Sequence, residues 1–131
     1  MWTLEDAKNY FAKDKYATVS TGIEILEVSE NYAKCAFKID ERQQNVVGHV
    51  MGGAIFTLAD FVFAVTTNTT EKVTVTAMSS ISYFSSPKGS ILYGESKMKK
   101  EGKKNCFYEI DIYDDLGTSV ACVSTNGVHI V

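Results

Sequence analysis

The spacing of hydrophobic residues predicts one short helix at the start of the chain. Apolar residues recur at helical intervals between Leu4 and Phe11, with polar residues between them. Thr3 precedes this stretch and Asp6 follows three residues later, which is a weak version of the capping box found at helix starts. We therefore expect a helix that covers Leu4 to Phe11.

Most of the remaining chain has the pattern of extended strands. β-Branched and apolar residues dominate Ala17–Glu30, a turn is expected at Glu30-Asn31, and apolar residues alternate with others from Tyr32 to Ile39. Four further strand-like segments occupy Val73–Tyr83, Ile91–Lys100, Lys104–Tyr113 and Ser119–Val131. Residues typical of turns interrupt these segments, and the short connections predict an antiparallel meander.

A second helix is predicted in the middle of the chain, after a polar loop at Asp40–Val50. It should begin near Met51 to Ala54 and continue to about Thr67, and it is apolar on nearly every side. Such a helix is expected to be buried on most sides, by a sheet and by a partner subunit. Asp60 is its only charged residue. Because an ionised carboxylate in apolar surroundings is costly unless paired, hydrated or used, Asp60 is the first candidate functional residue.

Composition and charge limit the classes of function. The chain has 131 residues, of which 45% are hydrophobic, and this length suits one domain with a real core. A formal net charge of −3 argues against nucleic acid as the main ligand. Five lysines nevertheless gather within Lys97–Lys104. They form either a solvated hairpin end or a site for an anionic ligand such as a nucleotide phosphate.

The cysteines and the amino terminus indicate a cellular location. Cys35, Cys106 and Cys122 lack metal-ligand spacing, and their odd number suggests no disulfide framework, so we expect reduced, buried thiols and no metal. The first residues are partly acidic and lack the apolar region of a signal peptide, and no apolar run has membrane-spanning length. These features predict a cytoplasmic protein without membrane attachment.

The segment from Asn45 through Gly48 to the paired glycines Gly52-Gly53, followed by the apolar helix to Asp60, resembles the signature of PaaI-type hotdog acyl-CoA thioesterases. The likeness continues through Ser80–Tyr83, Pro87–Gly89, Gly102-Lys103 and the terminal strand. It implies an α+β hotdog fold over residues 1–131, in which a curved antiparallel sheet wraps one central hydrophobic helix. It also implies hydrolysis of an acyl-CoA thioester without a metal or cofactor.

The resemblance assigns expected roles to individual residues. The family's catalytic carboxylate falls on Asp60, its oxyanion-binding backbone N–H on Gly53, and the side-chain amide that orients the water or the carboxylate on Asn45. A hydroxyl group that assists water in some relatives matches Thr76. Asp60 can act as a general base on water or as a nucleophile that forms a mixed anhydride, and both alternatives remain open.

One position departs from the family pattern. Many members have histidine immediately before the paired glycines, where this chain has Met51, and the nearest histidine is His49. Asn45 and Gly48 keep their spacing to Gly53, which leaves no room for a loop shift. We therefore expect an enzyme that works without this imidazole, with the change affecting substrate preference more than reaction class.

The chemistry explains why a helix start and a carboxylate are needed. The first helical turn has unpaired N–H groups at the positive end of the helix dipole, and glycines leave them accessible. Tight packing against a strand is the alternative explanation for Gly52-Gly53. Gly53 and Asp60 lie about 10 Å apart along the helix, too far for one thioester carbonyl to contact both in a single chain. We predict an obligate homodimer with shared sites, and by analogy with relatives a dimer of dimers.

The remaining candidates concern the substrate. The residues expected to bind it are Gly52, Met51, His49, Phe61, Tyr83, Ser85, Ser86, Lys88, Lys103 and Lys104. The serines and lysines among them would hold the nucleotide phosphates of coenzyme A. Phe56 and Phe63 are further candidates for the acyl pocket, although at least two of the four aromatic residues are expected in the core.

The sequence leaves two alternatives to hydrolysis open. One is a non-catalytic hotdog protein that binds acyl-CoA as a regulatory ligand, for which Met51 is the only support. The other is the dehydratase branch of the fold, which would require a histidine paired with an acid on the helix. The absence of histidine from the apolar helix argues against this second alternative.

Overall fold

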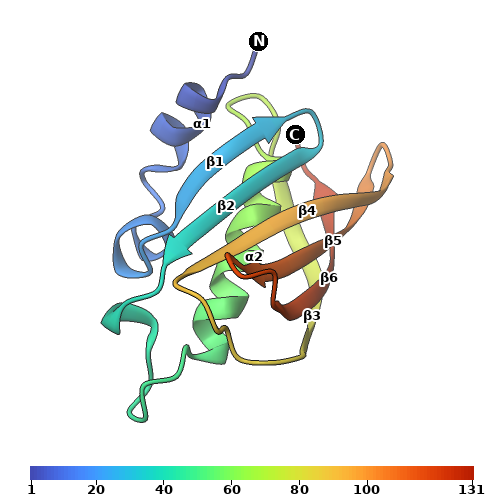
Figure 1. Ribbon diagram of the computed structural model, residues 1–131. Coiled ribbons are helices and arrows are strands. Elements are labelled where there is room, and N and C mark those ends of the chain that lie inside the picture. Colours follow the sequence, from blue (N-terminus) through green and yellow to red (C-terminus); the bar gives the residue numbers. More distant parts are fainter.

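A computed structural model describes residues 1–131 and contains two α-helices and one six-stranded antiparallel sheet (Figure 1). The elements follow in the order α1 (Leu4–Phe11), β1 (Glu24–Ser29), β2 (Tyr32–Lys38), α2 (Gly52–Thr67), β3 (Thr74–Tyr83), β4 (Ile91–Glu101), β5 (Asn105–Asp114) and β6 (Ser119–His129). Thr3 and Asp6 form the expected capping box before α1. Both predicted helices and the last four predicted strands are confirmed.

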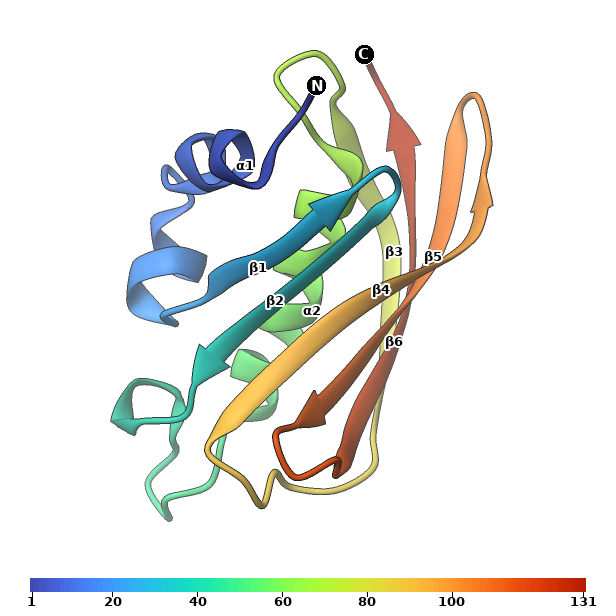
Figure 2. The same ribbon diagram turned by 45° about the horizontal axis from the view of Figure 1, so that its top comes forward.

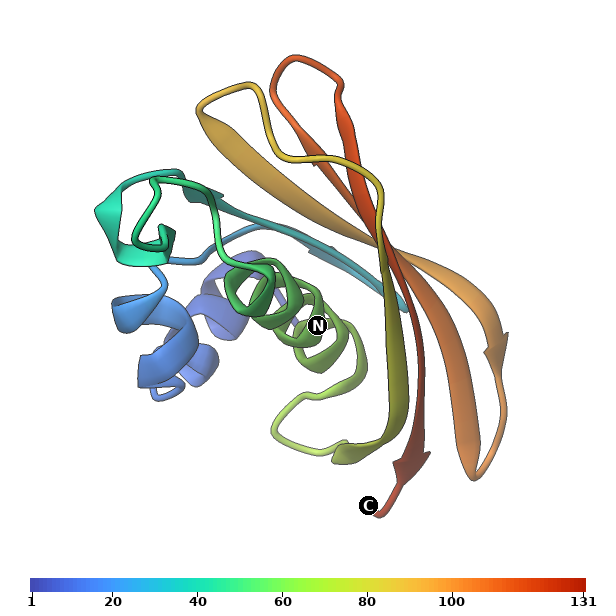
Figure 3. The same ribbon diagram turned by 90° about the horizontal axis from the view of Figure 1, so that it is seen from below.

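The sheet curves around α2, which lies on its concave side (Figures 2 and 3). Leu58 and Val62 of α2 are fully buried, and Gly94 of β4 lets them approach the sheet, because a Cβ atom there would lie 2.9 Å from Val62 and 3.2 Å from Leu58. On its other flank α2 contacts α1, with the rings of Phe61 and Phe11 5.8 Å apart. This arrangement is the predicted hotdog fold.

The strand predicted over Ala17–Glu30 is wrong in its first half. Residues Tyr16–Ser20 form a single π-helical turn, and β1 begins only at Glu24. The Thr18 and Thr21 hydroxyl groups donate hydrogen bonds of 3.0 Å to backbone carbonyls four and five residues earlier. These local side-chain bonds favour a turn over the extended conformation that β-branched residues otherwise prefer.

The predicted meander is also only partly correct. β4, β5 and β6 are consecutive neighbours, but the strand order is β1-β2-β4-β5-β6-β3, so β3 pairs with β6 and not with β4. The connection from Phe84 to Ser90 is long enough to cross the end of the sheet, which a tight turn could not do. As a result β3 is an edge strand, and most of its residues are exposed.

All three cysteines are free thiols; Cys35 and Cys106 are buried, as expected, and Cys122 is half-buried. No helix in the structure combines the length and apolar character needed to cross a membrane.

Candidate active site

The loop before α2 is held in place by Gln43, which is only 1% exposed. Its side-chain amide donates to the carbonyl oxygen of Thr21 at 2.7 Å and accepts from the Asp40 N–H at 2.8 Å, while its backbone carbonyl accepts from Met51 N–H at 2.8 Å. The hydrophobic pattern of the sequence does not predict this anchor. The pattern of Asp40 followed three residues later by glutamine, a capping box, was the available signal.

Asn45 shapes the tip of the same loop. Its side-chain oxygen accepts hydrogen bonds from the N–H groups of Val47 and His49, at 3.1 and 3.0 Å. Gly48 adopts φ +83°, which L-residues with a side chain rarely adopt, so this position of the loop requires glycine. Asn45 and His49 are both exposed, and in the single chain the carbonyl end of Asn45 is occupied by the loop.

The start of α2 leaves two backbone N–H groups without an acceptor inside the helix. Met51 is the N-cap and offers no side-chain hydrogen bond, and the first N–H groups bonded to its carbonyl are those of Ala54 and Ile55. A Cβ atom on Gly53 would meet nothing within 4 Å, so the space in front of it is open. The N–H groups of Gly52 and Gly53 can therefore receive an anion.

Tyr83 and the chain that follows it border the helix start. Tyr83 is 51% exposed, and its hydroxyl donates a hydrogen bond of 2.8 Å to the carbonyl oxygen of Gly52. A cavity of about 350 Å³ lies here, lined by Val50, Gly52, Ile55, Tyr83, Phe84, Ser85 and Ser86. The structure thus brings Gly52, Tyr83, Ser85 and Ser86, four of the predicted substrate-binding residues, to one cavity at the start of α2.

Asp60 lies on the exposed side of α2, and no ion pair of the structure includes its side-chain carboxylate. Desolvation by the surrounding side chains raises the pKa of its carboxyl group, and the nearby negative charge of Asp14 raises the pKa further. A carboxylate with a raised pKa and no partner suits general-base or nucleophilic chemistry.

Gly53 and Asp60 lie on one face of α2. Seven residues separate them, which is about 20° short of two full helical turns and about 10 Å along the axis. Both residues are exposed, and Thr57 between them is half-buried. In a single chain the two ends of this stripe are exposed, and no hydrogen bond or ion pair joins Gly53 to Asp60.

The other predicted residues fall into two groups. Thr76 is exposed and, two residues after the inward-facing Thr74, points toward the helix side of β3. Phe61 and Phe63 are 3% and 2% exposed and pack against Phe11 and Tyr108, so both belong to the core. The expectation that at least two of the four aromatic candidates are core residues is confirmed.

The loop from Ser85 to Gly89 has few free donors for a phosphate. The N–H groups of Lys88 and Gly89 donate to Asp114 at 2.8 and 2.9 Å, and the Ser85 hydroxyl donates to a backbone carbonyl of β6. Burial would raise the pKa of Asp114, but these and further backbone hydrogen bonds hold it well below its ordinary value. Contacts of this loop with phosphate would depend on the side chains of Ser86 and Lys88.

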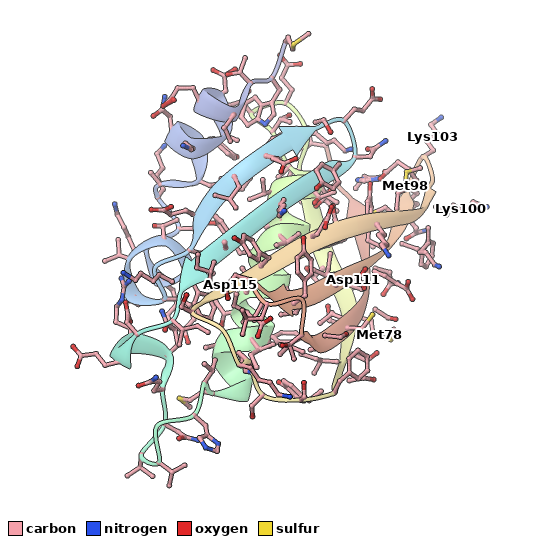
Figure 4. The ribbon with its side chains drawn as sticks, in the orientation of Figure 1. Met78, Met98, Lys100, Lys103, Asp111 and Asp115 are labelled. Carbon is pink, nitrogen blue, oxygen red and sulfur yellow. The ribbon has the colours of Figure 1, made fainter.

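Lys103 and Lys104 lie far from this loop within one chain. Figure 4 shows Lys100 and Lys103 projecting from the tip of the β4–β5 hairpin, whereas Asp115 lies near the opposite end of β4. Lys97 and Lys99 pair with acidic residues of β5 at 2.8 and 3.5 Å. The lysine strip and the Ser85–Gly89 loop therefore do not form one phosphate site in a single chain.

A cluster that the sequence did not predict joins the ends of three strands. Ligand atoms of Glu101, Cys106 and His129 lie within 4.8 Å of one another, which is close enough to consider a metal. His129 is already fully hydrogen-bonded, however: Nδ1 lies 2.7 Å from the Thr74 hydroxyl, and Nε2 contacts Glu101. Tyr108 donates to the other oxygen of Glu101 at 2.7 Å. Hydrogen bonding alone accounts for this cluster.

Comparison with known proteins decides the family. The thioesterase superfamily matches residues 47–121, which include the helix start, Asp60, Tyr83 and β3 to β5. This chain belongs to the thioesterase superfamily. It is accordingly a thioester hydrolase with a hotdog fold of the PaaI type.

Individual relatives and solved structures resemble this chain over most of its length. A protein of Archaeoglobus fulgidus named for an inferred esterase activity is 29% identical over 119 residues, covering 90% of this chain and 77% of the relative. The E. coli PaaI protein from the phenylacetic acid degradation operon superposes with a TM-score of 0.87 at 20% identity, covering 98% of this thioesterase and 94% of PaaI. A protein assigned as a thioesterase from Streptococcus pneumoniae TIGR4, crystallised with coenzyme A, has a TM-score of 0.81 at 21% identity, with coverages of 91% and 95%.

Proposed function

We propose that this thioesterase hydrolyses acyl-CoA thioesters at a site that two subunits share. The observation that carries the proposal is the pair of unsatisfied groups on one exposed face of α2: the N–H of Gly53 and the carboxylate of Asp60. The first can stabilise an oxyanion and the second can activate water. The S. pneumoniae structure with coenzyme A, which has the same fold, supports coenzyme A as the leaving group.

Two subunits are needed because the two groups are too far apart in one chain. If a second copy packs its α2 in the opposite direction on this stripe, Asp60 of one subunit approaches Gly53 of the other, and a two-fold axis generates two equal sites. The edge strand β3 supports such a contact, since Val75 and Met78 are 46% and 58% exposed on it. Figure 4 labels Met78 on this strand. Free strand edges commonly pair with another chain.

In this mechanism the thioester carbonyl oxygen accepts a hydrogen bond from the Gly53 N–H. Asp60 of the partner then removes a proton from water as the water attacks the acyl carbon. In the alternative route Asp60 attacks the carbon itself and forms a mixed anhydride, which water hydrolyses after the thiolate has left. The tetrahedral intermediate collapses with cleavage of the C–S bond, and the thiolate of coenzyme A accepts a proton. Asn45 and Thr76, both exposed, are the proposed groups that orient the water, and a single hotdog domain over residues 1–131 suffices for each half-site.

The Ser86 and Lys88 side chains and the lysines of another subunit, Lys103 and Lys104 among them, are the proposed contacts for the coenzyme A phosphates. Met51 and His49 flank the thioester at the helix start. We further propose that the shared-site dimers pair into tetramers and that the protein acts in the cytoplasm.

Thiol release from acetyl-, hexanoyl- and benzoyl-CoA tests the reaction, with the Asp60→Asn variant beside the wild-type protein. We expect turnover of at least one of these substrates and a loss of about 10³-fold in Asp60→Asn. Full activity of this variant would refute the role of Asp60. If no substrate turns over but acyl-CoA binds, the protein is the regulatory binding protein instead.

Subunit mixing tests the shared site. Asp60→Asn and Gly53→Pro subunits are each expected to be inactive, because one lacks the carboxylate and the other lacks the N–H. When they are refolded together, half of the dimers contain one intact site, so roughly a quarter of the wild-type activity should return. Mixed dimers that form but stay inactive would show that both groups act within one chain.

A further inference from the structure

Tyr83, the last residue of β3, contacts Gly52, the first residue of α2. Its hydroxyl donates a hydrogen bond of 2.8 Å to the carbonyl oxygen of Gly52. The sheet fixes the tyrosine, because Tyr83 pairs with Ala121 of β6 and the following N–H, that of Phe84, donates to the Val120 carbonyl at 2.8 Å. The carbonyl that accepts this bond belongs to the same peptide group as the N–H of Gly53.

This shared peptide group links Tyr83 to the proposed oxyanion donor. A trans peptide is planar, so its C=O and N–H point in opposite directions. Fixing the Gly52 carbonyl on one side therefore fixes the direction of the Gly53 N–H on the other. A hydrogen bond to the oxygen also draws electron density away from the nitrogen, and coupled hydrogen bonds strengthen one another by about 10–30% each.

The two glycines have different surroundings, which supports this assignment. A Cβ atom on Gly52 would lie 3.0 Å from the Tyr83 hydroxyl oxygen and 3.1 Å from its ring carbon Cζ. A Cβ atom on Gly53 would meet nothing within 4 Å. Glycine at position 52 thus admits the tyrosine to the peptide, and glycine at position 53 leaves the approach to its N–H open.

We propose that Tyr83 is a positioning residue that orients and polarises the Gly53 N–H for the oxyanion of thioester hydrolysis. This inference rests on the proposed function, in which Gly53 supplies that N–H. Tyr83 acts through the Gly52–Gly53 peptide, and its ring only borders the cavity. Loss of a complete oxyanion donor costs about 10²- to 10³-fold in kcat, so loss of its polarising partner should cost less, roughly tenfold.

The Tyr83→Phe variant removes the hydroxyl and keeps the ring. Its matched control is Tyr93→Phe, a half-buried tyrosine of β4 that stacks on Tyr113 away from α2. With hexanoyl-CoA and benzoyl-CoA we expect kcat to fall roughly tenfold in Tyr83→Phe with KM within about twofold, because only the transition state gains from the hydroxyl. Tyr93→Phe should match the wild-type protein.

A second readout follows the carbonyl group of the bound thioester substrate. In the Asp60→Asn background, hexanoyl-CoA labelled with ¹³C at the carbonyl should show an infrared band at lower frequency when bound, and adding Tyr83→Phe should move that band back toward the free ester. Fluorotyrosine at position 83, a stronger donor than tyrosine, should instead lower the frequency further and raise kcat in the active protein. This substitution tests the inference even if Tyr83→Phe folds poorly.

The inference is overturned if Tyr83→Phe keeps the wild-type kcat, or raises KM alone, with the carbonyl band unmoved. The same measurements distinguish a failure of this inference from a failure of the proposed function. If Asp60→Asn is inactive but Tyr83→Phe is fully active, only the role of Tyr83 fails. If Asp60→Asn retains the wild-type rate, the proposed mechanism fails, whatever Tyr83→Phe does.

Discussion

Asp14 lies close enough to Asp60 for its negative charge to raise the pKa of the Asp60 carboxyl group, in addition to the larger effect of desolvation. No cation of the chain offsets either effect: the ion pairs of the structure lie elsewhere. The carboxylate proposed to activate water is thus kept less acidic than an ordinary aspartate. Because only the ionised form can accept a proton, this pKa sets the acidic limb of the pH–rate profile.

The Asp14→Asn substitution should move that limb. Removal of the neighbouring negative charge lowers the pKa of Asp60, so activity should persist to lower pH than in the wild-type protein. The kcat/KM profile between pH 3 and pH 8 measures the shift, and Glu71→Gln, which removes an exposed acid after α2, is the control. A limb that stays in place in Asp14→Asn would mean that another group controls it.

The same pKa predicts a cost in stability. A carboxyl group whose pKa is raised by folding favours the folded state fully below its unfolded pKa, and this contribution is lost as the pH rises through the folded value. Asp60→Asn cannot ionise. The melting temperature of this variant, relative to that of the wild-type protein, should therefore be higher at pH 8 than at pH 4. Differential scanning calorimetry at both pH values measures this. An equal difference at the two pH values contradicts the prediction.

Asp114 should behave in the opposite way. It is 1% exposed and accepts N–H bonds from Lys88, Gly89, Leu116 and Thr118, at 2.8 to 3.0 Å, which lower its pKa. Its ionisation stabilises the fold above the ordinary value of 3.8, and this contribution is lost as the pH falls through the folded pKa. Asp114→Asn should lose about 2 kcal/mol at pH 7, since the new amide opposes these donors.

Urea unfolding at pH 7 and pH 3 tests this, with Asp115→Asn as the matched control. Asp115 is exposed and accepts bonds from the N–H groups of Ser90 and Ile91 at 2.9 and 3.3 Å. The Asp115→Asn substitution should therefore destabilise the fold less at pH 7 than Asp114→Asn does. The prediction is wrong if the two variants are equally destabilised, or if the loss in Asp114→Asn is the same at pH 3.

The sequence predicts features that depend on residues close together in the chain, and it does not predict contacts between distant segments. Periodicity located α2 and made Asp60 its only charge, because both depend on neighbours along the helix. The position of β3 beside β6 depends on pairing between segments about fifty residues apart, which strand composition does not encode. The Tyr83–Gly52 and Gln43–Thr21 bonds were missed for the same reason, although Tyr83 itself was a candidate.

The hydrogen-bonded cluster at the strand ends provides a prediction about stability alone. The Thr74 hydroxyl donates to the Thr67 carbonyl at 2.8 Å and contacts His129 Nδ1. Thr74→Val keeps the shape but leaves both partners unpaired, which should cost about 1 to 3 kcal/mol because Thr67 is buried. Chemical denaturation compared with Thr70→Val, an exposed threonine, checks this. Equal stability of the two variants would show that water replaces the lost bonds.

The two glycines at the start of α2 should respond differently to alanine. In Gly53→Ala the new methyl group meets no atom within 4 Å, so the fold should keep its stability or gain up to about 0.5 kcal/mol from the more restricted unfolded chain. The methyl group nevertheless stands where a thioester must approach the N–H. We therefore expect kcat/KM to fall sharply while the melting temperature stays constant.

Gly52→Ala should show the reverse balance. Its methyl group would lie 3.0 Å from the Tyr83 hydroxyl and must displace the tyrosine, so the melting temperature should fall and activity should fall with it. Thermal unfolding and thiol release measured on both variants separate the two effects. If Gly53→Ala is the less stable variant, or if it hydrolyses acyl-CoA at the wild-type rate, then the space before Gly53 is not where the thioester binds.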